Sequence, residues 1–314
     1  MNRYAILTDS SCDMDEALRR RFGIDDYVRG ILYCPDGREL RSDMDWNNGM
    51  TPESFYGAMK GRKALFRTAT PVAGEVAGVF ERYLREGRDI LFVAMSTGLS
   101  GTLQVCKSVG DALLQRYPER SIAYVDSLRY SGSEALVLML AARKRDEGLT
   151  LAENAAYLTQ ARHTVHQTGT MDDLFFLAKT GRISSFKAFF GSLAGVNPIA
   201  EINRQGMSEV LAKFKGRRAA FDATLRYMSR TILAPERQTV FVSQSARAEA
   251  AEQLAELVRR EFAPKELLIR PIGTSCGASI GPGMCAVFYQ GAPVTEGLEA
   301  EKRIVAEITA EMKQ

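Results

Sequence analysis

The stretch that decides the fold is Ile90-Leu91-Phe92-Val93-Ala94-Met95, followed directly by Ser96-Thr97-Gly98-Leu99-Ser100-Gly101-Thr102. The first six residues form an unbroken apolar run, which is typical of a parallel strand buried on both faces. The polar residues after it form a turn, and residues 103–114 have the pattern of a helix. A buried strand, a polar turn and a helix in this order predict one unit of an α/β fold.

The residues on either side repeat this alternation. Residues 73–86 place Val76, Phe80 and Leu84 at helical spacing, so they predict a helix with one apolar face. Pro35-Asp36-Gly37 is strong turn chemistry, so the strand before it is expected to double back. About the first 150 residues therefore predict a doubly wound parallel sheet. The other predicted strands here are 4–8, 27–34 and 122–125, and the other predicted helices are one that starts at Thr51-Pro52 and those over 135–146 and 151–163.

The second half of the chain is less regular. Residues 196–202 and 208–214 are predicted strands, and Asn203–Gly206 between them reads as a hairpin turn. A strand, a helix and a strand over 240–272 predict a βαβ unit. The other predicted elements are helices over 184–193, 217–232 and 296–312, a last strand over 286–289, and an apolar segment 174–178 before a Gly181-Arg182 turn. We expect an N-terminal α/β domain over 1–150, a C-terminal α/β domain over 151–290 and a helical tail over 291–314.

Composition narrows the function classes. The 314 residues exceed or match the size at which a single core stops growing, so one large domain or two smaller ones are both allowed. The net charge of +3 balances 41 Lys and Arg against 38 Asp and Glu. A nucleic-acid-binding domain usually has a much larger basic excess, so this class is disfavoured.

Cysteine content and hydropathy point to a cytoplasmic protein. The five cysteines are an odd number with no CxxC pair, which disfavours a disulfide framework and a structural zinc site. The N-terminal apolar run is too short for a secretory signal, and no run of 18 apolar residues predicts a transmembrane helix. If the protein handles lipid, we expect it to bury that lipid inside itself.

Three polar clusters fall where strands are expected to end, which is where open parallel sheets bind ligands. They are Thr8–Ser11, Arg67–Pro71 and Met95–Thr102. The third opens a helix, so it offers hydroxyls and free backbone N–H groups at the positive end of a helix dipole. It matches neither the Walker P-loop nor G-x-G-x-x-G, so a carboxylate or a single phosphate fits better than a nucleotide. The alternative is that Ser100 only caps the helix.

Two potential catalytic groups are weaker candidates. Asp9 resembles the nucleophile of phosphatases that use an aspartate after the first strand, but the next acidic residue does not have the usual two-residue spacing. Asp9 is therefore expected to hold a turn. His163 and His166 are the only histidines, and we expect them on the surface of one helix face. So few histidines make a Ser-His-Asp hydrolase difficult to build.

A glycine-rich segment and a basic segment lie in the second half. Residues 273–283 contain four glycines, which predict a tight loop where the backbone approaches something closely. Lys213, Lys215, Arg217 and Arg218 could form a basic rim together with Arg182, although such a charge run is usually a solvated face.

Taken together, these motifs resemble the DegV family from about Tyr4 to Tyr289. No single motif is specific, but their order and spacing are. The motifs are TDSSCD at 8–13, TATP at 68–71, STGLSGT at 96–102, VDS at 125–127, TGRISS at 180–185, GSLAGVNPI at 191–199, KFKGRR at 213–218 and GASIGPG at 277–283.

The resemblance implies two packed α/β domains, with a mainly parallel sheet in the first, a mixed sheet in the second, and a lipid buried between or within them. It implies one long-chain fatty acid in a buried tunnel and no other cofactor. The chain would be the acyl-carrying subunit of a fatty acid kinase and no enzyme by itself, because a separate ATP-binding protein phosphorylates the carboxylate. The fatty-acid carboxylate would be held by Thr68, Ser96, Thr97, Ser100 and Ser279, and the tunnel mouth, where the kinase docks, would carry Arg182, Lys213 and Lys215.

The chain departs from the family pattern at several positions. Ala69, Thr70 and Val72 stand where the family often has Ser, Gln and Ser, and Asn197 replaces a lysine. Ser279 and Ile280 replace a histidine and a threonine, which removes a donor that can carry charge. Two alternatives therefore stay open. One is a regulatory protein that binds a small anion or a lipid without a kinase, and the other is a phosphatase or acyl hydrolase that uses Asp9 or a loop serine.

Overall fold

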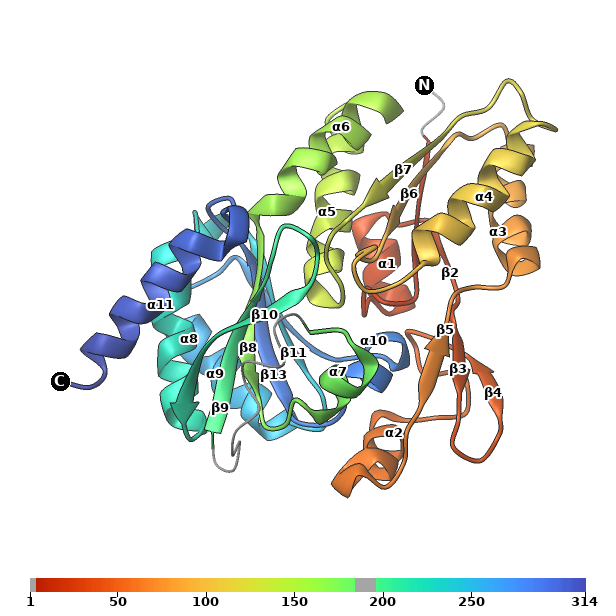
Figure 1. The fold of residues 1–314 in the computed structure, drawn as a ribbon. Helices are drawn as coiled ribbons and strands as arrows, with labels where there is room; N and C mark the ends of the chain where they lie inside the picture. The colour runs from red at the N-terminus through yellow and green to blue at the C-terminus, as the bar shows by residue number, and fades with distance from the viewer. Residues whose placement is uncertain (1–3, 184–195) are drawn as a thin grey trace. The chain divides into compact units, whose positions relative to one another are not determined.

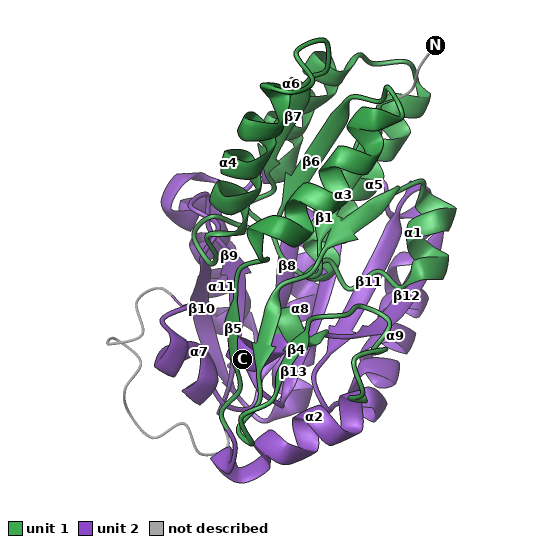
Figure 2. Cartoon of the chain, turned by 90° about the vertical axis from the view of Figure 1, so that its right-hand side faces the viewer, with its two compact units in different colours: residues 1–51, 65–162, 273–276 green, residues 52–64, 163–272, 277–314 purple. Residues whose placement is uncertain are grey.

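The computed structural model describes residues 4–183 and 196–314, and the chain divides into two compact units (Figure 2). Unit 1 comprises Met1–Thr51, Leu65–Arg162 and Gly273–Cys276, and unit 2 comprises Pro52–Ala64, His163–Ile272 and Gly277–Gln314. Both units are α/β, as the sequence predicts. The helix predicted over 184–193 lies outside the described residues.

Unit 1 is built on a four-stranded parallel sheet in the order β2-β1-β6-β7 (Figure 1). Every residue of β6 is buried, so the apolar run at 90–94 is the doubly covered strand that its composition predicts. The strands are β1 (Ala5–Asp9), β2 (Asp26–Val28), β6 (Ile90–Ala94) and β7 (Ile122–Asp126). The helices are α1 (Glu16–Phe22), α3 (Ala73–Arg85), α4 (Thr102–Leu114), α5 (Gly132–Asp146) and α6 (Leu151–Ala161).

Apolar packing against the sheet stabilises unit 1. The predicted apolar face of α3 supplies Val76 and Phe80, which belong to one buried cluster with Phe92 of β6. The Phe80 and Phe92 rings lie 5.3 Å apart. Helix α5 differs from α3 because it is buried almost all round, and it carries one acidic residue, Glu134, that is fully buried.

The single strand predicted over 27–34 is wrong. The chain instead leaves the parallel sheet after β2 and enters a small antiparallel sheet in the order β4-β3-β5. Its strands are β3 (Ile31–Tyr33), β4 (Glu39–Arg41) and β5 (Arg67–Ala69). The predicted turn at Pro35-Asp36-Gly37 is confirmed, since β3 and β4 form a hairpin in which Gly37 has a φ of 88°.

Unit 2 contains a mixed six-stranded sheet in the order β10-β9-β8-β13-β11-β12. The predicted hairpin at Asn203–Gly206 joins β9 and β10, and the predicted βαβ unit is β11-α9-β12 with parallel strands. The strands are β8 (Val165–Met171), β9 (Val196–Ile202), β10 (Ser208–Lys215), β11 (Thr239–Gln244), β12 (Glu266–Pro271) and β13 (Met284–Gln290). The helices are α2 (Pro52–Met59), α7 (Phe175–Thr180), α8 (Arg217–Thr231), α9 (Ala248–Phe262) and α11 (Glu299–Glu311), and α10 (Thr274–Ile280) crosses the boundary between the units.

The expectation of two surface histidines on one helix is wrong. Helix α6 ends at Ala161, and His166 lies in β8, a central strand that the sequence did not predict. The side chain of His166 is 1% exposed and contacts Glu201, which is also buried. The polar segment Val165–Met171 shows no clean apolar alternation, and its place in the sheet depends on partners that are distant in the sequence. Its backbone pairs with β13, and its Gln167 N–H donates to Glu201.

The unit boundaries also differ from the predicted domains. Helix α6 belongs to unit 1, and Pro52–Ala64 belongs to unit 2. The residues after 290 form no separate tail, because Val305 and Ile308 of α11 are buried in a cluster with Tyr227 of α8. The predicted boundaries follow the order of the elements along the chain, whereas the observed ones follow which segments pack together in space.

The glycine-rich segment at 273–283 contains the short helix α10, so the prediction of a tight loop is wrong there. The predicted close approach is confirmed at two glycines. A Cβ on Gly277 would lie 2.5 Å from the Tyr56 hydroxyl, and one on Gly281 would lie 2.1 Å from the Phe176 ring. The groups that approach these glycines are aromatic side chains of unit 2.

Candidate ligand site at the strand ends of unit 1

The ends of β1 and β6 are joined through one buried carboxylate. Asp9 accepts hydrogen bonds from the Ser11 backbone N–H (3.0 Å) and hydroxyl (2.6 Å) through Oδ1, and from the Met95 backbone N–H (2.9 Å) through Oδ2. Its side chain is 3% exposed, and burial raises its pKa. Asp9 therefore holds the turn, as predicted, and both of its oxygens are occupied within the fold.

The STGLSGT loop follows β6 as predicted and is anchored at its first residue. Ser96 is fully buried, its N–H donates to Arg129 O (2.8 Å), and its hydroxyl accepts from the Gly98 N–H (3.1 Å). The exposed Thr97 instead donates to Asp126 at the end of β7. The loop therefore turns one hydroxyl inward and the next outward.

The alternative that Ser100 is the N-cap of the helix is wrong, because Gly101 holds that position and α4 has no side-chain cap. Helix α4 begins at Thr102, and the Ser100 hydroxyl accepts from the Thr102 N–H at 3.3 Å. It also lies 2.9 Å from the Thr102 hydroxyl. Ser100 is only half-buried, so these contacts with Thr102 do not remove it from the surface of the loop.

The three predicted polar clusters come together in unit 1. A Cβ on Gly101 would lie 3.7 Å from the Thr70 methyl group, so the end of β5 lies beside the STGLSGT loop. On Gly30, a Cβ would lie 3.0 Å from Ala69 O and 3.9 Å from the Ser10 hydroxyl, which brings the first cluster to the same strand end. The first and third clusters follow β1 and β6, as expected for the carboxyl ends of parallel strands, whereas the second lies on and just after β5 of the antiparallel sheet.

Thr68 lies on β5, paired with Leu32 of β3, and it is half-buried. Its hydroxyl forms no hydrogen bond with another described residue. The Ser42 hydroxyl is buried and also lacks a partner among the described residues, and it lies 4.0 Å from the position of a Cβ on Gly30. Native proteins seldom leave buried hydroxyls unpaired, so this edge of unit 1 has unused donors for a ligand.

A buried acid beside this edge was missed by the sequence analysis. Glu134 on α5 accepts a hydrogen bond from the Thr8 hydroxyl (3.0 Å), and its Oε2 contacts the Ser11 hydroxyl oxygen, whose one proton is donated to Asp9. Burial and the neighbouring Asp9 carboxylate raise the pKa of Glu134 well above the ordinary glutamate value. The only sequence signal was a single acidic residue inside an otherwise apolar helix.

Glu134 gives the stability of the chain a specific pH dependence. Because its pKa is raised, the folded chain holds this proton more tightly than the unfolded chain does. Its stabilising contribution is fully present below the unfolded pKa and is lost as the pH rises through the folded pKa. Glu134→Gln is therefore expected to be at least as stable as wild type at neutral pH, with its advantage shrinking toward about pH 4. Urea unfolding between about pH 4 and neutral pH measures the difference in free energy of unfolding between the variant and wild type. The control is Glu86→Gln at an exposed position, whose difference from wild type should not change with pH. A Glu134→Gln difference that is equally constant would contradict the raised pKa of Glu134.

The remaining predicted residues lie in unit 2. Ser279 is half-buried in α10. Arg182 follows α7, and its guanidinium donates to Thr180 O. Lys213 and Lys215 are exposed and two residues apart on β10, so they share one face of that strand.

The structure separates Arg182 from the two lysines. Ile183 bridges to Ser208 at the start of β10, whereas Lys215 is the last residue of that strand. At roughly 3.3 Å per residue, these two ends of β10 are on the order of 20 Å apart. Arg182 and Lys215 therefore cannot contact the same small group.

The chain matches the family model described as "Uncharacterised protein, DegV family" over residues 3–292. The chain belongs to the DegV family. A DegV domain-containing protein of Clostridium perfringens is 30% identical over 292 residues, which cover 93% of this chain and 98% of the relative. One from Streptococcus pyogenes serotype M1 is 29% identical over 288 residues, which cover 92% and 98%.

Solved DegV structures share the fold. A fatty-acid-binding DegV family protein from Thermus thermophilus superposes with a TM-score of 0.81 at 24% identity, covering 92% of this chain and all of the other. A DegV lipid-binding protein from Thermotoga maritima gives a TM-score of 0.79 at 19% identity, with coverage of 93% and 99%. DegV from Bacillus subtilis, described as a fatty acid binding protein, gives 0.77 at 21% identity, with coverage of 93% and 100%. The two α/β units of this chain are therefore those of the DegV fold.

Proposed function

We propose that this DegV protein binds one long-chain fatty acid and holds its carboxylate with Thr68 and the hydroxyls of the STGLSGT loop. The observation that carries the proposal is the set of unused hydroxyl donors, Thr68 and Ser42, beside the loop that begins at Ser96. A carboxylate taken out of water needs such donors, because an unpaired buried charge is very costly. Fatty-acid binding by DegV relatives of the same fold supports this choice of ligand.

The acyl chain would provide most of the affinity. Roughly fifteen CH₂ groups at about 0.8 kcal/mol each amount to about 12 kcal/mol before costs. Ordering and association costs remove several kcal/mol of this sum, and the remainder still corresponds to tight retention. The proposal places the acyl chain within the protein. None of the helices in the described residues has the length and apolar content of a membrane span.

The first test is the composition of the purified protein. A solvent extract of protein from a heterologous host is expected to contain close to one fatty acid per chain by mass spectrometry, because a tightly retained ligand survives purification. Protein stripped of lipid should take up added palmitate or oleate, with extracts of an unrelated purified protein as the control. If the extract holds no acyl species and neither acid binds, the chain does not carry fatty acids.

We further propose that the bound carboxylate is presented to a separate ATP-dependent kinase, which converts it to an acyl phosphate. Phosphoryl transfer depends on positioning and on cationic stabilisation, and Arg182, Lys213 and Lys215 are the candidate cations. Because the structure separates Arg182 from Lys215, we assign them different roles, with at most one of them beside the reacting carboxylate. Acyl-phosphate formation by a purified kinase, ATP and loaded carrier tests this step. If the loaded carrier is inert with every such kinase, it is a lipid binder outside that reaction.

The hydrolase alternative receives less support from the geometry. The Asp9 carboxylate is buried and accepts three hydrogen bonds from Ser11 and Met95, so it cannot reach a substrate phosphate. His166 is engaged by Glu201 and by Ala292 O, so it cannot act as the base of a loop serine. No acid–base pair for hydrolysis forms among these groups.

A further inference from the structure

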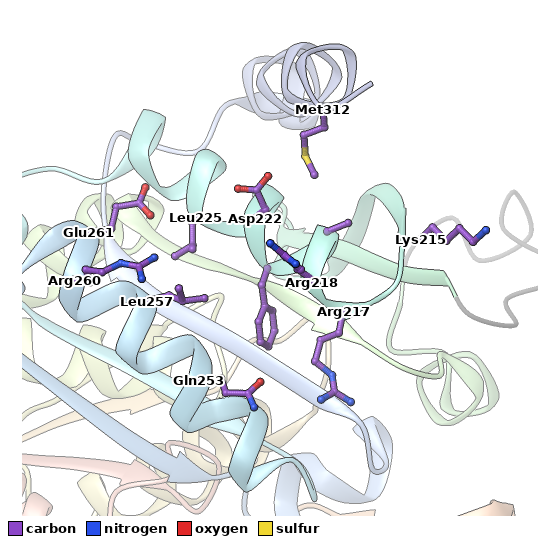
Figure 3. A pocket seen from close by; sticks show the side chains of 12 residues that line it. Lys215, Arg217, Arg218, Asp222, Leu225, Gln253, Leu257, Arg260, Glu261 and Met312 are labelled. Carbon is purple, nitrogen blue, oxygen red and sulfur yellow. The ribbon is translucent and has the colours of Figure 1, made fainter. Parts of the chain in front are cut away.

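A groove of about 990 Å³ lies on unit 2 between α8 and α9 (Figure 3). Its floor is apolar: Phe221 and Leu225 are buried core residues, and Leu257 and Met312 are half-buried. Its rim is charged. The remaining lining residues are Lys215, Arg217, Arg218, Ala219, Asp222, Gln253, Arg260 and Glu261.

The rim carries cations that the fold does not neutralise. Lys215, Arg217, Arg218 and Arg260 are exposed, and none of them forms an ion pair with a carboxylate in the described parts of the chain. The arginines further along α8 differ sharply. Arg226 pairs with Asp222 and Glu311, and Arg230 pairs with Glu307 and Glu311. Within α8, the unpaired cations are therefore the two at the N-terminal end, which borders the groove.

Two of these cations occupy locally unfavourable positions. Arg217 and Arg218 are the first two residues of α8, where the helix dipole favours acidic side chains. The first turn of α8 contains no acidic residue and has no side-chain cap. A sequence that breaks a local rule without a compensating contact within the fold often does so for function.

We propose that the α8–α9 groove is a docking surface for an acidic, amphipathic segment of a partner protein. Carboxylates of such a segment would pair with the rim arginines, and its apolar side chains would enter the groove over Phe221 and Leu257. Arginine is enriched at protein interfaces, and apolar pockets surrounded by polar rims are typical binding centres. The inference goes beyond lipid binding and does not depend on it.

A membrane surface fits the groove less well. The large apolar side chains that are exposed among the described residues are Tyr33, Leu65, Val72 and Leu233, and none of them lines the groove. The apolar groups of the groove are recessed, whereas insertion into a bilayer requires apolar side chains that protrude. A partner segment that brings its own protruding side chains is therefore favoured.

The probe for this proposal is a fluorescently labelled helical peptide with glutamates on one face and leucines on the other. We expect saturable binding to the full-length protein by fluorescence anisotropy, with affinity falling as salt is raised. The triple variant Arg217→Gln/Arg218→Gln/Arg260→Gln is expected to weaken binding by at least about tenfold. Hydrogen exchange should show peptide-dependent protection on α8 and α9. A peptide with lysines in place of the glutamates should not bind.

The control is Lys60→Gln/Lys63→Gln/Arg85→Gln, which removes the same charge from exposed positions outside the groove. It should bind the peptide like wild type. All six substituted residues are exposed, so both triple variants are expected to keep the wild-type melting temperature. Equal peptide binding by wild type and the groove variant, or no binding by wild type, would overturn the proposal.

Two further measurements separate the competing explanations. If wild type binds vesicles of anionic phospholipid but not the peptide, and the groove variant loses vesicle binding, the groove serves a lipid surface and the proposal fails. Fatty-acid content is measured for every variant and is expected to stay unchanged. Loss of fatty acid from wild type itself would defeat the proposed function, while the peptide result would still decide the role of the groove.

Discussion

Thr68→Ala and Ser96→Ala are each expected to weaken fatty-acid binding by about 10- to 150-fold. Removing one donor from a buried charged hydrogen bond costs about 1.5–3 kcal/mol, which corresponds to this range. Thr68 has a half-buried hydroxyl without a partner in the described fold, and Ser96 is the fully buried start of the STGLSGT loop. Dissociation constants for a fluorescent fatty acid, measured on delipidated protein, test the expectation.

The controls for this experiment separate ligand contact from loop damage. Ser108→Ala removes an exposed hydroxyl from α4 and should bind like wild type. Ser96→Ala also removes the acceptor for the Gly98 N–H, so its melting temperature must be compared with that of Thr68→Ala, which loses no such bond. If both variants bind like wild type, the carboxylate lies elsewhere, and Ser100 and Ser279 become the residues to test.

Glu201→Gln is expected to lower the free energy of unfolding by about 1–3 kcal/mol, the usual effect of leaving buried hydrogen-bond donors without their acceptor. Glu201 Oε2 lies 2.8 Å from His166 Nδ1 and accepts from the Tyr227 hydroxyl at 3.1 Å. Its Oε1 accepts from the backbone N–H groups of Gln167 and Ile202. In the glutamine variant, the side-chain NH₂ group would face one pair of these donors and could not accept their hydrogen bonds.

Urea unfolding measures this effect, with Glu252→Gln on the exposed face of α9 as the control. The control should stay within about 0.5 kcal/mol of wild type, as surface substitutions usually do. Because His166 Nε2 also lies 2.7 Å from Ala292 O, the variant should increase hydrogen exchange in the segment between β13 and α11. A Glu201→Gln protein as stable as wild type would show that the hydrogen bonds of Glu201 contribute little to the free energy of unfolding.

Local patterns were sufficient where neighbouring residues in the sequence determine the structure of a segment by themselves. The run at 90–95, the apolar stripe of α3 and the turn at Pro35-Asp36-Gly37 each produced the predicted element. The STGLSGT loop was placed correctly for the same reason, because a strand end and a helix start on either side determine where it lies.

Local patterns failed where the partners are far apart in the sequence. Strand β8 is polar, and it lies inside the sheet because β9 and β13 pair with its backbone and Glu201 accepts from its Gln167 N–H. His166 was expected at the surface because nothing near it in the sequence pairs with it. Helix α11 was expected to be a tail, because only its packing against α8 shows that it belongs to the core of unit 2.

The sequence by itself determined the α/β class, the order of most elements and the family, because these depend on residues close together in the chain and on motifs read in order. The tertiary structure decided which hydroxyls of the STGLSGT loop are buried and which are exposed. Ser96 is buried, Thr97 donates to Asp126 and Ser100 accepts from the Thr102 N–H, although the three lie within five residues of one another. It also separated Arg182 from Lys215 and left the cations beside α8 unpaired. Side-chain direction and charge pairing depend on neighbours that only folding brings together.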